Sequence, residues 1–234
     1  MAKKNAKHSH MTTAELIGGG VLFVVYLLIM PLLLQKICTV LGVLLDRRIS
    51  TTAAATVYYY VMTLVVAALF HKFLGKAGSR FFGNLNQSCI TAGMALVLFY
   101  GANELFCRIC TRFIMPVGNL NDVTIVADVD HVPRTTMLII VLLAPFVEEV
   151  LFRGLVFGWL AEKSAAVAYV VSAALYAFGC LWQVLAGGAT TASLLVLAQY
   201  MIPGLIFAWA YGRSGSVVTA VIVHAAVNAL AFVA

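Results

Sequence analysis

The sequence predicts an all-α fold, a polytopic membrane helix bundle of about seven transmembrane helices. Of the 234 residues, 63% are hydrophobic and only 10% are charged, whereas a soluble globular domain carries roughly a quarter charged residues. The apolar residues also fall into runs of about 20, the length of an α-helix that crosses a bilayer. We therefore expect an integral, multi-pass membrane protein that has lipids as partners.

The first apolar run, Leu16 to Leu34, follows a basic amino-terminal tail. This run is too long for the apolar part of a signal peptide and no small-residue cleavage site follows it, so a retained helix is predicted. The segment Ile37 to Leu45 is apolar but too short to cross. It extends the first helix, lies at the interface or forms a re-entrant piece, which leaves an eighth span open. The seven predicted spans are 14–34, 52–70, 88–107, 136–161, 165–186, 192–211 and 215–233.

One long polar connection, Thr111 to Arg134, separates three amino-terminal spans from four carboxy-terminal spans. It contains two prolines and three of the seven acidic residues that lie outside 141–160. The chain is therefore predicted to consist of two parts within one membrane domain. Residues 1–134 supply the tail, three transmembrane helices and the polar loop, and residues 135–234 supply a core of four transmembrane helices.

The formal net charge of +6 does not indicate nucleic acid as a partner, because the basic residues are spread through short loops. That distribution fits anionic lipid headgroups better. A small excess of Lys and Arg falls in the loops that are cytoplasmic if the amino terminus is cytoplasmic. The positive-inside rule then favours a cytoplasmic amino terminus, and the plasma membrane is the expected location.

Three charged residues stand inside the fourth predicted span, in the run "VLLAPFVEEVLFRGLVFGWL". Glu149 and Arg153 are four residues apart, so they share a helix face and are predicted to form an ion pair. Glu148 is rotated by about 100° from Glu149 and has no charged partner on its own helix. Pro145 removes a backbone hydrogen bond one turn earlier, which predicts a kink or a helix start there.

A carboxylate within a membrane span indicates a functional site by default, and a buried Glu can serve as a general base. The alternative is a cluster of polar side chains that joins helices and has a purely structural role. The last span contains "VIVHAAVNAL", in which His224 and Asn228 are four residues apart. This spacing places both polar side chains on one face, and it indicates the wall of a polar cavity.

The motif "EEVLFRG", followed by "HAAVN", resembles the CPBP (Abi) family of intramembrane proteases. That family includes CAAX prenyl endoproteases and lysostaphin resistance protein A-like proteins. Its core motifs are EExxxR, FxxxH and HxxxN on separate membrane helices. The resemblance covers about residues 136–234. The first three spans carry no motif.

The resemblance implies a role for each matching residue. Glu148 would be the base that activates water, and Glu149 with Arg153 would be the structural ion pair. His224 and Asn228 would stabilise the tetrahedral intermediate, as preorganised donors do in an oxyanion site. No metal or other cofactor is expected, because a catalytic zinc uses three protein ligands and Glu148 with His224 supplies two.

The second motif departs from the family pattern. Its expected place is "SAALYAFGCLW", where Phe178 matches but Trp182 stands four residues later in place of His. A Trp side chain has no acceptor and cannot take a proton from water. The loss of one positioned proton-transfer partner costs about 10²–10⁴ in rate. The five cysteines lie in or beside apolar runs and are predicted to be buried thiols.

Two functions remain after these observations. The first is an intramembrane glutamate-type endopeptidase that cleaves a membrane-associated peptide or protein, weakened by the loss of the second-motif His. The alternative is a non-catalytic membrane scaffold, or a protein of immunity or cell-envelope regulation, which binds a peptide or partner protein in the same cavity. A proton-coupled transporter is disfavoured, because the sequence shows no internal repeat and no paired broken helices.

Overall fold

The computed structural model describes residues 11–46, 51–118 and 134–232, and every regular element in these ranges is a helix. The all-α prediction is therefore confirmed for these parts of the chain. Several helices contain widened π-helical segments, marked η. The elements are α1 (Thr13–Val24), η1 (Val25–Ile29), α2 (Met30–Leu44), α3 (Thr51–Leu69), α4 (His71–Gly83), α5 (Leu85–Phe113), α7 (Arg134–Leu138), η3 (Ile139–Leu143), α8 (Ala144–Glu149), η4 (Val150–Phe157), α9 (Gly158–Ala161), α10 (Ala165–Ala186), α11 (Thr191–Ser214) and α12 (Val217–Leu230).

The amino-terminal helix is tied to the bundle at its first turn. Thr12 and Glu15 form a capping box, which satisfies backbone N–H groups that a helix start leaves unpaired. The buried carboxylate of Glu15 also accepts a hydrogen bond from the backbone N–H of Phe73 at 2.8 Å. The first turn of α4 is thereby joined to the first turn of α1.

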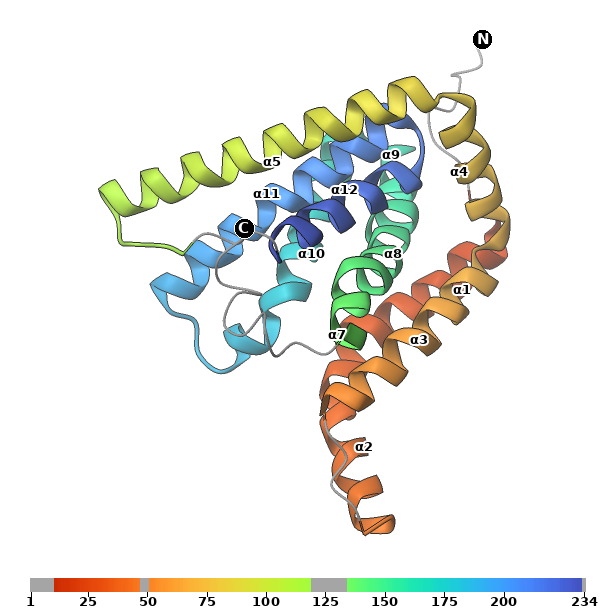
Figure 1. Ribbon diagram of the computed structural model, residues 1–234, viewed down its shortest axis with the longest axis vertical. Coiled ribbons are helices and arrows are strands. Elements are labelled where there is room, and N and C mark those ends of the chain that lie inside the picture. Colours follow the sequence, from red (N-terminus) through yellow and green to blue (C-terminus); the bar gives the residue numbers. More distant parts are fainter. Residues whose placement is uncertain (1–10, 47–50, 119–133, 233–234) are drawn as a thin grey trace.

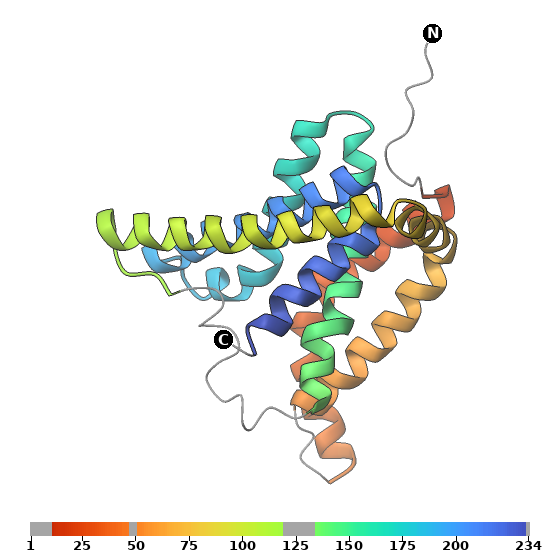
Figure 2. The same ribbon diagram turned by 45° about the horizontal axis from the view of Figure 1, so that its top comes forward.

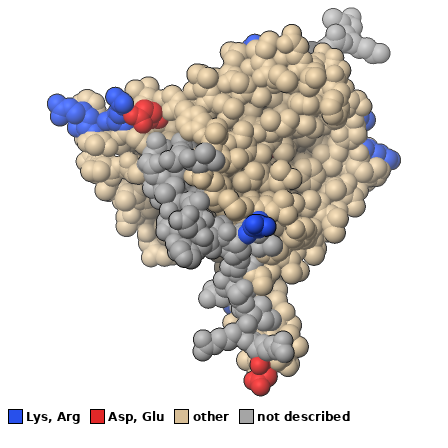
Figure 3. Space-filling model, in the orientation of Figure 1, with Lys and Arg blue, Asp and Glu red and all other residues tan. Residues whose placement is uncertain are grey.

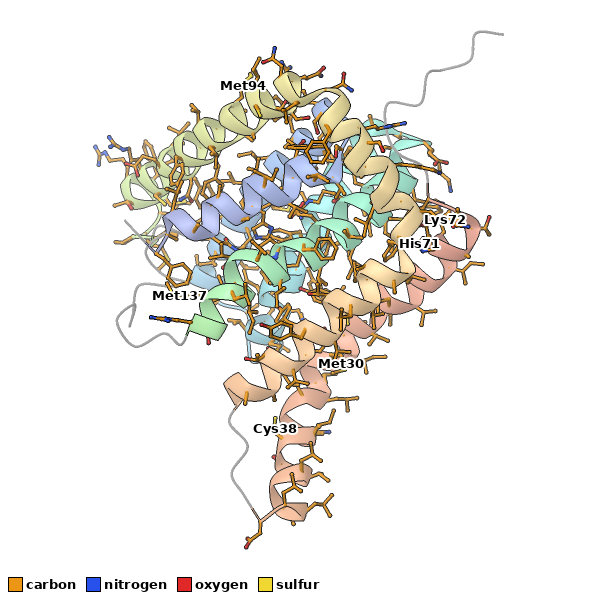
Figure 4. All side chains as sticks on the ribbon, turned by 45° about the vertical axis from the view of Figure 1, so that its right-hand side comes forward. Met30, Cys38, His71, Lys72, Met94 and Met137 are labelled. Atoms are coloured by element: carbon orange, nitrogen blue, oxygen red, sulfur yellow. The ribbon has the colours of Figure 1, made fainter. Side chains whose placement is uncertain are left out.

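The first predicted span is a bent helix, and another bend follows the second predicted span. The chain turns by 59° between Thr13–Ile29 and Leu32–Leu44, and α2 projects from the bundle in both ribbon views (Figures 1 and 2). Met30 lies near this bend and Cys38 lies on the projecting part (Figure 4). The segment Ile37 to Leu45 lies almost entirely on α2, which continues the first helix after the bend; a pair bent in this way is either a broken span or a re-entrant loop. A second bend, of 83°, separates α3 from α4.

The structure does not confirm the predicted number of spans. Three of the described helices, α5, α10 and α11, are long and apolar enough to cross a membrane, and the number rises to five if each bent pair is one span. The helix α12 is shorter, with 14 residues. An integral membrane protein is thus supported, whereas the predicted count of seven or eight spans is not confirmed. Of the predicted polar connection, residues 119–133 lie outside the described residues.

The fourth predicted span is a continuous helical run from α7 to α9, in which the helix type changes four times. The π-helical segments η3 and η4 flank the six-residue helix α8, which carries Glu148 and Glu149. Pro145 lies at the start of α8, directly after η3, and it has no N–H to donate to the preceding turn. The predicted kink or helix start is therefore a change of helix type.

The central helical run lies between two groups of helices. On one side it contacts α1 and α3, and on the other it contacts α10, α11 and α12 (Figure 1). α10 and α11 approach closely, because a Cβ atom added at Gly204 would lie 2.8 Å from the Cα of Ala173. The face drawn in Figure 3 carries few charged side chains, and most of these lie near its outline. Most of that surface is thus compatible with lipid.

Candidate active site

The two oppositely charged residues of the fourth predicted span form a buried ion pair. Arg153 Nη1 lies 2.8 Å from Glu149 Oε1, and both side chains are completely inaccessible to solvent. The second guanidinium nitrogen, Nη2, donates to the backbone oxygen of Gly204 at 3.1 Å. The guanidinium carbon also lies 4.5 Å from the ring centroid of Tyr176 and 5.3 Å from that of Phe207. These contacts compensate in part for burying the positive charge.

His224 belongs to the same buried cluster. Its Nδ1 lies 2.8 Å from Glu149 Oε1, the oxygen that also binds Arg153. A carboxylate oxygen is an acceptor, so Nδ1 carries the proton and Nε2 is the ring atom that remains for other partners. The ring stacks on Phe207 with centroids 4.6 Å apart. Glu149 and Phe207 therefore fix the direction of the imidazole.

The remaining imidazole nitrogen faces Glu148. His224 Nε2 lies 3.9 Å from Glu148 Oε2 and 3.5 Å from the hydroxyl oxygen of Tyr176. At 3.9 Å the two groups are too far apart for a strong direct hydrogen bond, but a water molecule between them can reach both. The other carboxylate oxygen, Glu148 Oε1, accepts a hydrogen bond from the Tyr26 hydroxyl at 2.8 Å.

Glu148 lies between two cavities. The first, which we call the tyrosine cavity, has a volume of about 320 Å³ and is lined by Tyr26, Tyr58, Tyr59 and apolar side chains of α2, α3 and η4. The second, the histidine cavity, has a volume of about 250 Å³ and contains His224 and Asn228. Glu148, Tyr176 and Cys180 line both cavities. The carboxylate of Glu148 is therefore accessible from two sides.

Asn228 lines the histidine cavity one helical turn after His224. Its Nδ2 donates a hydrogen bond of 2.8 Å to the backbone oxygen of Ile140, in the π-helical segment η3. An amide nitrogen has two hydrogens, so this bond orients the side chain and uses one of them. The second hydrogen remains for a group inside the cavity.

The residues of α10 that line the cavities are not the two expected for the second motif. Tyr176 and Cys180 line both cavities, whereas neither cavity is lined by Phe178 or Trp182, and Phe178 is 38% exposed. Phe178 and Trp182, the degenerate second motif of the sequence, thus line neither cavity, and their part in the site stays a prediction. Tyr176 and Cys180 have the same four-residue spacing, so a helix presents them on one face. Cys89 and Cys180 are exposed, so the prediction of buried thiols is wrong for these two cysteines, whereas Cys38, Cys107 and Cys110 are buried.

The structure offers no cluster of metal ligands among the residues that it describes: no three His, Cys, Asp or Glu side chains lie close enough together to hold an ion. The polar groups around Glu148 are instead hydroxyl, imidazole and amide groups. Such groups orient a carboxylate and exchange protons with it.

Two residues near Glu148 were not expected from the sequence. Tyr26 lies 122 positions before Glu148, in a span without any motif. The signal available was weak: Tyr26 is the one hydroxyl-bearing residue in an otherwise apolar run from Gly18 to Leu34. Tyr176 lies four residues before Cys180, and an aromatic residue at this spacing was a possible match to the Phe of the second motif.

Comparison with known proteins supports the predicted resemblance. Residues 131–230 match the family model described as type II CAAX prenyl endopeptidase Rce1-like. No curated protein and no solved structure matches the chain significantly. The matched segment contains Glu148, Glu149, Arg153, Tyr176, Cys180, His224 and Asn228. It does not contain Tyr26.

Proposed function

We propose that this protein is an intramembrane endopeptidase that cleaves a membrane-associated peptide or protein, because residues 131–230 match the family model described as type II CAAX prenyl endopeptidase Rce1-like. The scissile bond lies in the histidine cavity, with Glu148 as the general base. The approach of Glu148 Oε2 to His224 Nε2, at 3.9 Å on the wall of this cavity, carries the proposal. A catalytic base must reach the proton it removes directly or through one water molecule.

The proposed reaction is hydrolysis of a peptide bond, in which Glu148, His224 and Asn228 act in turn. Glu148 takes a proton from water, and the resulting hydroxide adds to the carbonyl carbon of the scissile peptide bond. The oxygen of the tetrahedral intermediate then carries negative charge. In the proposed step His224 takes part as an imidazolium, which keeps its Nδ1–H on Glu149 throughout and donates its Nε2–H to this oxygen. The second hydrogen of Asn228 Nδ2 donates to the same oxygen, as in an oxyanion site. Glu148 returns its proton to the leaving nitrogen as the carbon–nitrogen bond breaks.

Glu149 and Arg153 act indirectly in this scheme. Arg153 holds the Glu149 carboxylate at 2.8 Å, and Glu149 in turn holds His224 Nδ1 at 2.8 Å. A hydrogen bond at one ring nitrogen decides which tautomer is present and where the other nitrogen points. The ion pair therefore orients the imidazole toward Glu148, and it has a positioning role besides its structural one.

The test is peptide cleavage by the purified protein in detergent. The substrates are fluorescence-quenched peptides, each synthesised with and without an S-prenyl cysteine near its carboxyl end. We expect cleavage by the wild type and a loss of at least about 10²-fold in Glu148→Gln, which keeps the shape but not the basicity. The matched control is Glu104→Gln, which neutralises an exposed carboxylate on α5. Equal cleavage by wild type and Glu148→Gln contradicts the role of Glu148.

One observation favours a second candidate, a non-catalytic scaffold that binds a peptide or partner in the same cavity. The second-motif position that faces Glu148 carries the thiol of Cys180 and not an imidazole. This candidate predicts that a partner co-purifies with the protein and that Glu148→Gln retains it. The peptide assay above distinguishes the two, since a scaffold cleaves none of the peptides.

The orientation in the membrane is a further part of the proposal. We place the protein in the plasma membrane with a cytoplasmic amino terminus, as the distribution of Lys and Arg favours. On this orientation the start of α4, with His71 and Lys72, lies at the cytoplasmic surface (Figure 4). A thiol-reactive, membrane-impermeant reagent applied to intact cells should therefore leave a cysteine introduced at Lys72 unlabelled.

A further inference from the structure

The site contains a residue from outside the family-matched segment. Tyr26 lies in the π-helical segment η1 of the first helix, and its hydroxyl donates to Glu148 Oε1 at 2.8 Å. This contact is shorter than that of the other carboxylate oxygen, which lies 3.9 Å from His224 Nε2. The two oxygens of Glu148 are thus in different environments.

The first helix is held tightly against the site. Phe152 contacts the rings of both Phe23 and Tyr26 edge-on, with centroids 5.2 Å and 6.4 Å apart. One residue after Tyr26, Leu27 packs against α10 so closely that a Cβ atom at Gly179 would lie 2.9 Å from a Leu27 methyl carbon. Close packing on both sides leaves the Tyr26 ring little freedom to move.

We propose that Tyr26 is a positioning residue that holds Glu148 Oε1 and thereby directs Glu148 Oε2 toward His224 and the histidine cavity. A carboxylate rotates about its last side-chain bond at little cost, so an unheld Glu148 would also adopt rotations in which neither oxygen points toward His224. The hydroxyl of Tyr26 selects one orientation. The proposal rests on the function proposed above, and it assigns to the first helix a part in completing the site.

The variant Tyr26→Phe tests this proposal, because it removes the hydroxyl and keeps the ring that packs against Phe152. A reactive group that is no longer held in place reduces the rate much more than it reduces binding. We expect kcat to fall by about tenfold to 100-fold with KM changed by less than about twofold. The measurements are kcat and KM for the best peptide of the cleavage assay.

The matched control is Tyr58→Phe. The Tyr58 hydroxyl lies in the same tyrosine cavity, is buried, and has no hydrogen-bond partner within the described residues. Its removal should change neither kcat nor KM. Thermal unfolding of both variants in the same detergent checks the fold, and an unchanged transition for Tyr26→Phe shows that its lower kcat does not come from unfolding.

The outcomes separate this inference from the function on which it rests. A lower kcat in Tyr26→Phe alone, with KM unchanged, supports the positioning role. Wild-type kcat in Tyr26→Phe, while Glu148→Gln is inactive, overturns the positioning role and leaves the proposed function intact. A loss that appears only as a higher KM, or equally in Tyr58→Phe, also overturns it. Full activity in Glu148→Gln overturns both.

Discussion

The buried ion pair between Glu149 and Arg153 allows a quantitative prediction of how a substitution changes the free energy of unfolding. Arg153→Met replaces the guanidinium by an apolar side chain of similar length. It leaves the Glu149 carboxylate completely buried, with His224 as its remaining partner. Breaking a buried ion pair by removing one partner costs about 3–5 kcal/mol, because the other charge stays uncompensated. The variant also loses the hydrogen bond to the Gly204 oxygen and the contact with the Tyr176 ring.

The chain contains a matched control for this change. Arg108 and Glu104 on α5 form an ion pair of the same i,i+4 type, with 2.6 Å between nitrogen and oxygen, but their side chains are 77% and 50% exposed. Such exposed pairs contribute about 0.2–1 kcal/mol. Arg108→Met should therefore change the free energy of unfolding several-fold less than Arg153→Met, although the substitution and the helical spacing are identical.

Equilibrium unfolding in mixed micelles of detergent and SDS, followed by circular dichroism, measures both variants. The double variant Arg153→Met/Glu149→Leu should recover part of the stability lost in Arg153→Met, because no buried charge is left without a partner. If Arg153→Met and Arg108→Met lower the free energy of unfolding by the same amount, or if the double variant is less stable than Arg153→Met, the assignment of a compensated buried pair is wrong.

Two further predictions concern the second motif and the helix packing. Cys180→His places an imidazole at a position that faces Glu148 and should raise kcat of peptide cleavage by about tenfold or more. Trp182→His should not raise kcat, since Trp182 lines neither cavity. A gain only in Trp182→His would show that α10 turns a different face toward Glu148. Gly204→Ala should lower stability by about 1–3 kcal/mol, because its Cβ meets backbone atoms of Ala173. Gly75→Ala, where nothing lies within 4 Å of the added Cβ, should not lower it, and equal melting temperatures would contradict the close approach of α10 and α11.

Local sequence patterns predicted how site residues on the same helix lie relative to one another. The i,i+4 spacing of Glu149 and Arg153 placed them on one face, and helix geometry separated Glu148 from both. The apolar runs located the helices. They did not reveal the bends after Ile29 and Leu69, because a bent helix and a straight one have the same composition.

The parts of the site that depend on several helices could not be predicted in the same way. The contact between His224 and Glu149 joins residues 75 positions apart, and that between Tyr26 and Glu148 joins residues 122 positions apart. Such contacts depend on how each helix is rotated about its axis, which packing determines. The same limit explains the second motif: the identity of Phe178 suggested one register, but the rotation of α10 turns Tyr176 and Cys180 toward Glu148.

The most direct test of the proposed hydrolysis at Glu148 is the incorporation of oxygen from water into the cleaved peptide. The best substrate is incubated with the purified protein in H₂¹⁸O, and the products are analysed by mass spectrometry. We predict one ¹⁸O atom in the new carboxylate formed by the wild type, and no product above background with Glu148→Gln. Equal amounts of ¹⁸O-labelled product from the wild type and Glu148→Gln would contradict the assignment of Glu148 as the base.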